Sequence, residues 1–228
     1  MGFNLGNLKI SSIYVGSTKV SKAYIGTSPV FIEGLKPEAA PNGIYIQHIN
    51  DLLYTEEQWT TKWNDNAVGI AVISDNCRFV IAPNEVSFEK IWANSTPVSI
   101  EGLTPIDDLS LAKNDYNGVA NTDKISAVFS SVESSAAAAC KSYLFKNGKS
   151  GYLGSCGEWN EVINNKATIS KYLRLIKGVD FLGGTFCYWT STLSSDRSAW
   201  GAKLGQSYLT FGTYVFSAKR PTRAFCNL

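Results

Sequence analysis

The chain has 228 residues, 44% of them hydrophobic, so it can bury a substantial core and is not expected to be disordered. Charged residues make up only 18% while aromatic residues reach 12%, a balance typical of proteins whose Tyr, Trp and Phe also serve at surfaces. The formal net charge is +2, and no basic cluster exceeds the pair Lys219-Arg220. Nucleic acid is therefore not an expected partner.

No segment of the sequence is suited to crossing or entering a membrane. The longest apolar stretches, residues 67–74 and 136–140, are far shorter than the roughly 20 residues that span a bilayer. The N-terminal residues contain no basic segment followed by an apolar core, so no signal peptide is expected in this sequence. We expect a soluble protein with no membrane insertion.

The cysteines do not form a recognisable ligand or disulfide pattern. There are five of them, an odd number, with wide spacing and no C-x-x-C pair. This pattern supports neither a zinc site nor a dense disulfide framework. We predict free buried thiols at Cys77, Cys140, Cys156, Cys187 and Cys226.

Residues 1–32 contain a ten-residue repeat, marked by Leu5-Gly6, Val15-Gly16 and Ile25-Gly26. Each copy predicts a short strand, a turn and another strand. So small a sheet cannot bury its apolar face alone, so it must pack on the rest of the chain, on other subunits or on a larger assembly. A structural N-terminal sheet and an attachment module both fit. Residues 33–42, with Pro37 and Pro41, are typical of a linker.

From residue 43 the pattern predicts a mixed domain that reaches residue 228. Residues 44–46 and 52–54 indicate a pair of strands, and residues 68–73 and 77–81 indicate a hairpin. Between them, Thr55 to Gln58 resembles a capping box that opens a helical turn carrying Trp59 and Trp63. The hairpin is expected to be core scaffold.

Helical patterns follow in the middle of the chain. Apolar residues recur at helical spacing from Ile125 to Tyr143, which predicts one helix there. A second helix is predicted to begin at the capping box Ser155 to Glu158. A third pattern, residues 169–176, is predicted to end at Gly178 with a left-handed cap.

After residue 178 the sequence predicts only strands and turns. Trp200, Ala202 and Leu204 alternate with Gly201 and Lys203, as expected of a strand that buries one face. The other face is then free to contact a ligand. The whole pattern predicts an α+β domain with two or three helices and a terminal antiparallel sheet, preceded by a small all-β module.

Four short motifs, in order, resemble a known family. They are Gly-Tyr-Leu-Gly-Ser-Cys-Gly-Glu-Trp at 151–159, Tyr-Trp-Thr-Ser-Thr at 188–192, Ala199-Trp200, and Arg-Pro-Thr-Arg-Ala-Phe at 220–225. The set resembles C-type-lectin-like domains of Bacteroides and their phages. Within these it is most similar to the variable proteins of diversity-generating retroelements, whose fold also resembles formylglycine-generating enzymes. The resemblance covers residues 40–228, and the N-terminal repeats resemble segments at the start of phage tail or virion-associated proteins.

The resemblance implies two groups of residues in the terminal segment. Trp189, Trp200, Arg220 and Arg223 would anchor the fold. The ligand-binding positions that match the family's diversified slots are Leu193, Ser195, Asp196, Gly201, Lys203, Gln206, Tyr208, Thr210, Phe211, Gly212, Tyr214 and Phe216. Their mixed types suit an evolved binding surface, in which Tyr and Phe supply area and small polar residues adapt. The alternative is an ordinary β-surface with a few exposed aromatic residues.

The sequence departs from the family pattern in two places. Family templates are rich in Asn codons at the variable slots, but no Asn occurs between Asn165 and Asn227. This fits a heavily diversified copy and equally a relative that never diversifies. Gly154 stands where many relatives have Pro, which should soften the approach to the second helix.

The chemistry needed for an enzyme is sparse. The single histidine, His48, lies in a predicted hairpin and is expected to be exposed, and any Ser-His or Cys-His mechanism would depend on it. Cys187 and Cys226 could approach each other, as the paired cysteines of formylglycine-generating enzymes do. Beyond the shared fold no motif supports that activity.

No cofactor or metal site is expected. Trp63-Asn64-Asp65 matches a calcium-lectin motif by letters, but it lies far upstream of the terminal strands, and we interpret it as coincidence. Asp107-Asp108 and residues 114–117 lack the spacing of a calcium loop and are interpreted as solvated loops.

The sequence therefore favours a non-enzymatic ligand-binding protein, a phage or prophage tail component that recognises a host-surface protein or glycan. Residues 1–32 would contact other virion proteins, and analogy with tail proteins favours a homotrimer. The expected location is a virion or a cell surface. The alternatives are a secreted adhesin or pilus-tip lectin and, from another class, a formylglycine-generating-type enzyme.

Overall fold

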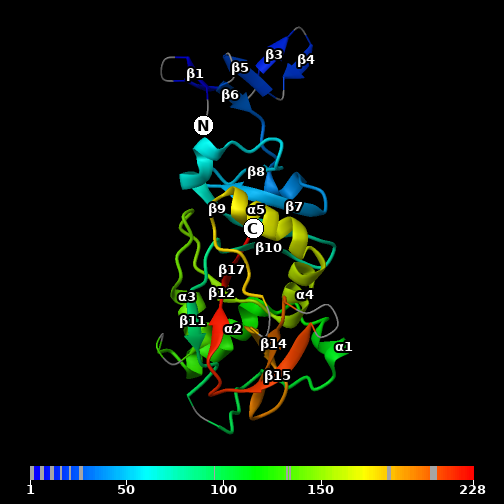
Figure 1. The fold of residues 1–228 in the computed structure, drawn as a ribbon, viewed down its shortest axis with the longest axis vertical. Helices are drawn as coiled ribbons and strands as arrows, with labels where there is room; N and C mark the ends of the chain where they lie inside the picture. The colour runs from blue at the N-terminus through cyan, green and yellow to red at the C-terminus, as the bar shows by residue number, and fades with distance from the viewer. Residues whose placement is uncertain are drawn as a thin grey trace.

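The structure is a computed structural model that describes residues 3–5, 8–10, 13–15, 17–20, 22–25, 28–94, 96–131, 133, 135–183, 186–205 and 210–228. It combines helices with antiparallel sheets, so the predicted α+β class is confirmed. Its elements lie along one long axis (Figure 1). The N-terminal hairpins lie at one end of this axis, and strands β14 (Ser198–Ala202) and β15 (Phe211–Val215) lie near the other.

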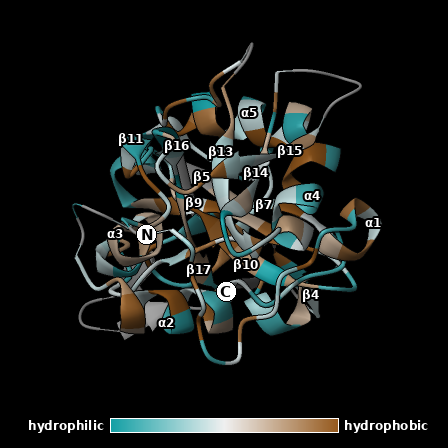
Figure 2. Cartoon of the chain, turned by 90° about the horizontal axis from the view of Figure 1, so that it is seen from below, coloured by the Kyte–Doolittle hydropathy of each residue, from teal (hydrophilic) through white to brown (hydrophobic). Residues whose placement is uncertain are grey.

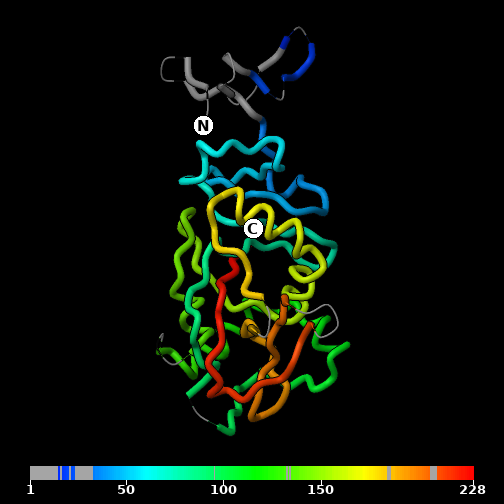
Figure 3. The backbone as a smooth tube through the Cα atoms, in the orientation of Figure 1, coloured from blue at the N-terminus to red at the C-terminus, as the bar shows by residue number. Residues whose placement is uncertain are grey.

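The N-terminal repeat forms three hairpins, one for each copy. Each is a separate two-stranded antiparallel sheet. The strands are β1 (Phe3–Leu5), β2 (Leu8–Ile10), β3 (Ile13–Val15), β4 (Thr18–Val20), β5 (Lys22–Ile25) and β6 (Ser28–Ile32). The predicted pair of strands in each unit is confirmed. Figure 1 shows the labelled hairpin strands at one end of the chain, and Figure 3 shows the segment after them entering the larger body.

Residues 33–42 were predicted to be a linker, but the structure shows them fixed to the body. Leu35 exchanges backbone hydrogen bonds with Leu53 at 2.8 Å, and a short 3₁₀ helix spans Pro37–Ala39. Arg78 donates to the carbonyls of Pro37 and Ala40. The segment therefore joins the N-terminal hairpins to the body through specific contacts.

A six-stranded antiparallel sheet forms the centre of the body, in the order β12-β17-β10-β9-β7-β8. Its strands are β7 (Gly43–His48), β8 (Leu53–Tyr54), β9 (Ala67–Ile73), β10 (Arg78–Ile81), β12 (Tyr152–Leu153) and β17 (Ala224–Asn227). The predicted strand pair β7–β8 and hairpin β9–β10 are both confirmed. Every residue of β9 is buried because core lies on both faces of the sheet. At Gly69 a Cβ atom would overlap the carbonyl oxygen of Ile81.

An aromatic cluster closes one end of this sheet. Thr55 N donates to Gln58 Oε1 at 2.8 Å, which is half of the predicted capping box. The chain then enters a 3₁₀ helix, Thr61–Asn66, and places Trp59 and Trp63 edge to face at 5.7 Å. The predicted turn is confirmed, and it is a core element.

Two helices replace the single helix predicted over residues 125–143. They are α2 (Gly118–Val128) and α3 (Ala136–Ser142). The apolar spacing continues across the break, but serines occupy positions 130, 131 and 135, and serine hydroxyls compete for backbone hydrogen bonds. Ser135 starts α3 by accepting from Ala138 N at 3.3 Å.

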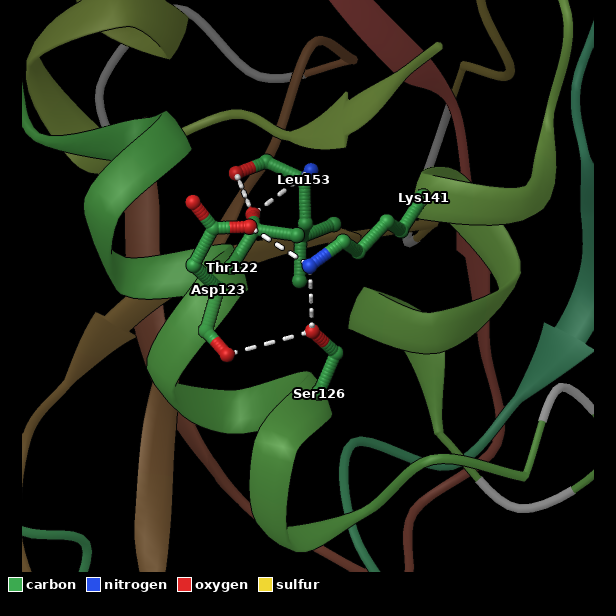
Figure 4. A network of polar contacts seen from close by, with 5 residues as sticks. All are labelled: Thr122, Asp123, Ser126, Lys141 and Leu153. Atoms are coloured by element: carbon green, nitrogen blue, oxygen red, sulfur yellow. Dashed lines mark hydrogen bonds and ion pairs between the residues drawn. The ribbon is translucent and has the colours of Figure 1, made fainter.

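Polar contacts tie α2 to its neighbours (Figure 4). Lys141 Nζ of α3 lies 2.7 Å from Asp123 Oδ1 and donates to Ser126 Oγ at 3.3 Å. Thr122 Oγ1 accepts from Leu153 N at 2.9 Å and so fixes α2 to β12. The helix pair is thereby held against the central sheet.

Helices α4 (Cys156–Asn164) and α5 (Lys166–Leu175) follow the predicted positions. The capping box between Ser155 and Glu158 is complete. The C-terminal cap differs from the prediction, because Lys177, with φ of 60°, takes the left-handed conformation. Gly178 is instead needed for close approach, since a Cβ there would lie 2.7 Å from Pro83 O. A short helix α1 (Leu109–Ala112) is capped by Asp108.

The buried residues form two clusters on opposite sides of the central sheet. One includes residues of α4 and α5, and the other includes residues of α2 and α3. Figure 2 shows both hydrophilic and hydrophobic turns on these surrounding helices, as expected of helices that bury one face. Among the described residues, no helix is both long and apolar enough to cross a bilayer.

Candidate ligand-binding surface

The terminal segment folds into a three-stranded antiparallel sheet in the order β13-β14-β15, where β13 is Tyr188–Leu193. Trp200, Ala202 and Leu204 pack into one core cluster, as predicted. The face predicted to be free is also buried along β13 and β14, because Trp189, Leu193 and Ala199 pack into the second core cluster. Trp200 Nε1 donates to Ile106 O at 2.7 Å, so a buried ring also holds the loop beside it.

Two of the predicted anchors fix this sheet to the strand pair β11 (Ser87–Lys90) and β16 (Arg220–Thr222). Trp189 is fully buried and donates to Lys90 O at 2.8 Å. Arg223, just beyond β16, is also fully buried and pairs with the buried carboxylate of Glu85. Glu85 Oε1 also accepts from Tyr188 OH at 2.7 Å. The anchoring positions predicted for Trp189, Trp200 and Arg223 therefore lie in the core.

Six of the predicted ligand-binding residues reach solvent. They are Ser195, Asp196, Lys203, Thr210, Gly212 and Tyr214. Asp196 is exposed and the other five are partly buried. They come from the β13–β14 turn, the end of β14 and the length of β15, so the fold brings them to the outer part of one sheet.

Three other predicted residues do not reach the surface, and their assignment as exposed contacts was wrong. Leu193 is 2% exposed, Phe211 is 1% and Phe216 is 0%. Phe216 stacks on Trp92 with ring centroids 4.6 Å apart. These side chains are buried because Leu193 and Phe216 pack into one core cluster and Phe211 into the other. Gln206 and Tyr208 lie outside the described residues.

The two glycines of the predicted surface differ. Gly201 and Gly212 are directly opposite on β14 and β15. A Cβ at Gly201 would overlap Cys187 Sγ, and Gly201 is buried, so this position cannot present a side chain without rearrangement. A Cβ at Gly212 would meet only Tyr214 OH at 3.2 Å and the end of Lys203 at 3.4 Å. Gly212 is therefore open to substitution.

The β13–β14 turn is held rigidly although it lies at the surface. Ser194 Oγ and Ser195 Oγ lie 2.8 and 2.7 Å from Ser198 Oγ. Val98 N donates to the backbone oxygen of Asp196 at 2.7 Å, which leaves the Asp196 side chain directed away from a fixed backbone. A rigid turn lowers the entropy that binding must overcome.

Tyr214, a partly exposed residue of β15, lies close to two basic residues. The Arg220 guanidinium carbon is 3.9 Å from the Tyr214 ring centroid, and Lys203 Nζ is 5.8 Å from it. Both contacts are in the range of cation–π attraction. Arg220 is only partly buried, so it differs from the other three predicted anchors.

The motif at 151–159 builds a buried polar network behind this sheet. Glu158 accepts hydrogen bonds from Tyr152 OH at 2.7 Å and from Ser155 N at 2.7 Å. Thr192 of β13 accepts from Cys156 N at 2.9 Å and donates to Asp115 Oδ2 at 2.7 Å. The motif thus positions β13.

The ionisation of Glu158 is unusual for a carboxylate. Burial raises the pKa of Glu158 from 4.5 to about 7, although its hydrogen bonds from Ser155 and Tyr152 act in the opposite direction. Its two oxygens accept hydrogen bonds from Ser155, at the start of α4, and from Tyr152. We interpret this group as structural.

Sequence reasoning missed Asp115 and Glu85, two buried acids that hold the terminal strands. Asp115 was interpreted as part of a solvated loop, but it is 6% exposed and accepts from Asn117, Asn121 and Thr192. The one local sign of this role in the sequence was the spacing of Asp115 and Asn117, which is typical of an Asx turn. Glu85 contacts Arg223, 138 residues away, and local sequence gives no sign of such a pair.

The candidate catalytic groups of the sequence lie in the core. His48 is 4% exposed rather than exposed as predicted, because Trp59, Trp63 and Tyr54 surround its ring. Burial lowers the pKa of His48. Asn64, of the lectin-like letters at 63–65, bonds Trp59 Nε1 and Leu175 O.

All five cysteines are free, as predicted. Four of them are buried, also as predicted, but Cys77 is only partly buried. Burial raises the pKa of the Cys187 thiol to about 11 and that of Cys226 to about 12. Both are protonated at neutral pH, whereas a nucleophilic thiol is usually activated by a lowered pKa. Within the described part of the chain, no three His, Cys, Asp or Glu side chains gather in a way that could hold a metal ion.

Comparisons of this chain with protein-family models, with curated protein sequences and with solved structures returned no match.

Proposed function

We propose that this protein is a non-enzymatic receptor-binding protein, and that its ligand contacts the solvent-accessible residues of β15, of the β13–β14 turn and of the segment just after β14. The observation that supports this proposal is that some residues of the terminal sheet are buried and fix the fold, while others reach solvent. The buried strands β13 and β14 fix the backbone of the sheet, while Gly212 and Tyr214 of β15 and Lys203, just after β14, reach solvent. Side chains there can change without changing the core.

The scaffold is proposed to be C-type-lectin-like, on the resemblance of its four motifs. Those motifs supply the buried framework of the terminal sheet: Glu158 and Cys156 from the first, Trp189 from the second, Trp200 from the third and Arg223 from the fourth. A framework of this kind would allow variation at the exposed positions between them. Hypervariability would follow if the segment is diversified.

The arrangement along the long axis suits a protein that is attached at one end and recognises at the other. The N-terminal hairpins and the β14–β15 end lie at opposite ends in Figure 1. We propose that residues 1–32 join a phage or prophage tail, so that the terminal sheet faces a host-surface protein or glycan. Trimeric display would convert weak contacts into avidity.

Binding to whole cells tests this proposal. The purified chain carrying a fluorescent label should bind intact Bacteroides cells and reach saturation. A variant with Ser195→Ala, Asp196→Ala, Lys203→Ala and Tyr214→Ala should bind at least about tenfold more weakly, because interface energy concentrates in a few residues. A matched variant, Glu38→Ala with Lys62→Ala, changes exposed charges elsewhere and should bind as the parent does.

The gene context tests diversification separately. A near-copy of the codons for residues 188–223, differing mainly at adenines and lying beside a reverse transcriptase gene, would support a diversified surface. Without such a copy the protein would be a binder of fixed specificity. A signal peptide or lipobox in the complete open reading frame would favour a secreted adhesin or pilus-tip lectin instead.

A further inference from the structure

The basic groups of the candidate surface lack the acidic partners found elsewhere in the structure. Lys90 lies 3.4 Å from Glu133, and Lys219 lies 3.6 Å from Glu89. Among the described residues, no Asp or Glu forms an ion pair with Lys203 or Arg220. Two positive charges therefore share one tyrosine without neutralisation.

The three side chains are held in place before any ligand arrives. Tyr214 lies beside Gly201 and Gly212, where the missing side chains leave room for its ring. Trp189 supports it edge to face, with ring centroids 6.3 Å apart. Arg220 stacks on the ring at 3.9 Å. A guanidinium that stacks on a ring can still donate hydrogen bonds from N–H groups in its plane, and the planar carboxylate matches that geometry.

The adjacent backbone offers a second feature. β15 is the outer strand of its sheet, and no described strand pairs with its free edge. From Gly212 to Val215 every residue is partly or well exposed, and the Val215 side chain is 57% exposed. An unpaired edge of this kind accepts an extended peptide as an added strand.

We propose that the ligand is an extended acidic peptide segment that adds to the free edge of β15 and places a carboxylate against Lys203, Tyr214 and Arg220. The inference rests on the proposed function and narrows its ligand to a protein. The edge favours a peptide over an acidic glycan, because strand addition uses backbone hydrogen bonds that a sugar chain cannot form. Arg220 also stacks on one face of the Tyr214 ring, so that face is closed to sugar stacking.

Two capped probe peptides test the proposal on the full chain. One is a decamer of alternating Thr and Glu, and the other is a decamer of alternating Thr and Gln. The Glu peptide should shift the backbone amide NMR signals of residues 212–215 and bind more weakly as salt rises. The Gln peptide should bind at least about tenfold more weakly, since charge-assisted hydrogen bonds are lost.

Single variants assign the contacts. Lys203→Gln and Arg220→Gln should each weaken the Glu peptide by about tenfold or more. Lys219→Gln removes a neighbouring exposed cation and should change affinity less than about twofold. If Arg220→Gln unfolds, Lys203→Gln and Tyr214→Phe still carry the test.

The proposal is overturned if the Glu peptide does not bind, if both peptides bind equally, or if none of the variants weakens binding. It is also overturned if a carboxylated oligosaccharide such as a hyaluronan decasaccharide binds at this face and the Glu peptide does not. Cell binding distinguishes a failure of this inference from a failure of the proposed function. If the four-residue variant loses cell binding while the Glu peptide fails, only this inference falls; if that variant binds cells normally, the proposed function falls.

Discussion

Arg220 and Arg223 are three residues apart in one strand region, yet they occupy opposite environments. Arg223 is fully buried and pairs with the buried carboxylate of Glu85. Arg220 is partly exposed, stacks on Tyr214 and has no carboxylate partner among the described residues. One residue type therefore occupies two kinds of environment here. The paired arginine stabilises the sheet, and we propose that the arginine without a carboxylate partner binds a ligand outside the chain.

The largest predicted contrast is in stability. Arg223→Met should lower the free energy of unfolding by about 3–5 kcal/mol, because it leaves the Glu85 charge buried without compensation. Arg220→Met should cost only about 0.5–1 kcal/mol, the loss of an exposed cation–π contact. Urea unfolding of the two variants measures this difference.

A double variant tests whether the uncompensated charge of Glu85 causes the loss of stability in Arg223→Met. Glu85→Gln with Arg223→Met removes both charges and should recover part of the stability lost in Arg223→Met. The amide oxygen that Glu85→Gln introduces would still accept the hydrogen bond from Tyr188 OH. Equal losses from Arg220→Met and Arg223→Met would contradict the assignment of separate roles.

Phe216→Ala should cost a similar amount, about 3–5 kcal/mol, because Phe216 is fully buried against Trp92. Tyr214→Ala should cost clearly less, since its ring is partly exposed. Differential scanning calorimetry of the two variants makes the comparison. A Phe216→Ala protein that melts with the parent would place this ring outside the core.

The stability of the sheet's supporting network should depend on pH. The pKa of Glu158 is about 7 in the folded protein against an ordinary 4.5, so the folded state holds the proton across this range. Its contribution to stability is therefore fully present below pH 4.5 and is lost as pH rises through about 7. Glu158→Gln should remove this dependence and be more stable than the parent at pH 8, by an amount on the order of 2–3 kcal/mol.

His48 also contributes to the pH dependence of stability, because burial lowers its pKa. Its contribution has the opposite sign, since stability falls when pH drops below the ordinary histidine pKa and the buried ring must take up a proton. The Glu158→Gln comparison isolates the carboxyl because both proteins retain His48. Parallel stability curves for parent and variant from pH 5 to 8 would show that Glu158 is not protonated in the fold.

The two glycines give a smaller contrast within the surface itself. Gly201→Ala should destabilise by about 1–3 kcal/mol, because the new methyl group overlaps Cys187 Sγ. Gly212→Ala should change stability by less than about 1 kcal/mol, since only a flexible lysine end and a hydroxyl must move. Thermal melts of the two variants decide which glycine position can vary.

Local patterns predicted much of the fold. The alternation at Trp200, Ala202 and Leu204 identified the buried face of β14, and the spacing of Ser155 and Glu158 identified the start of α4. These features depend on neighbours within a few residues, so the sequence contains them directly. The helix predicted over residues 125–143 was divided because hydrogen bonding by serines overrode apolar periodicity.

The candidate surface was predicted less completely. The fold brings six of the twelve proposed contacts to solvent, but burial of Leu193, Phe211 and Phe216 depends on partners such as Trp92, which lies 124 positions before Phe216. Glu85 and Arg223 are likewise far apart in the sequence, 138 positions from each other. Sequence alternation indicates that one face is buried, but it does not indicate where loops and distant rings cover the other.

We propose that solvent-accessible residues of β15, of the β13–β14 turn and of the segment just after β14 bind the ligand, while the buried residues between them maintain the fold. The most direct measurement is to pair thermal melting with Bacteroides cell binding for the variant Ser195→Ala, Asp196→Ala, Lys203→Ala, Tyr214→Ala. We predict a melting temperature within a few degrees of the parent, as expected of surface substitutions, and binding weakened by at least about tenfold. Undiminished binding by this folded variant would contradict the claim.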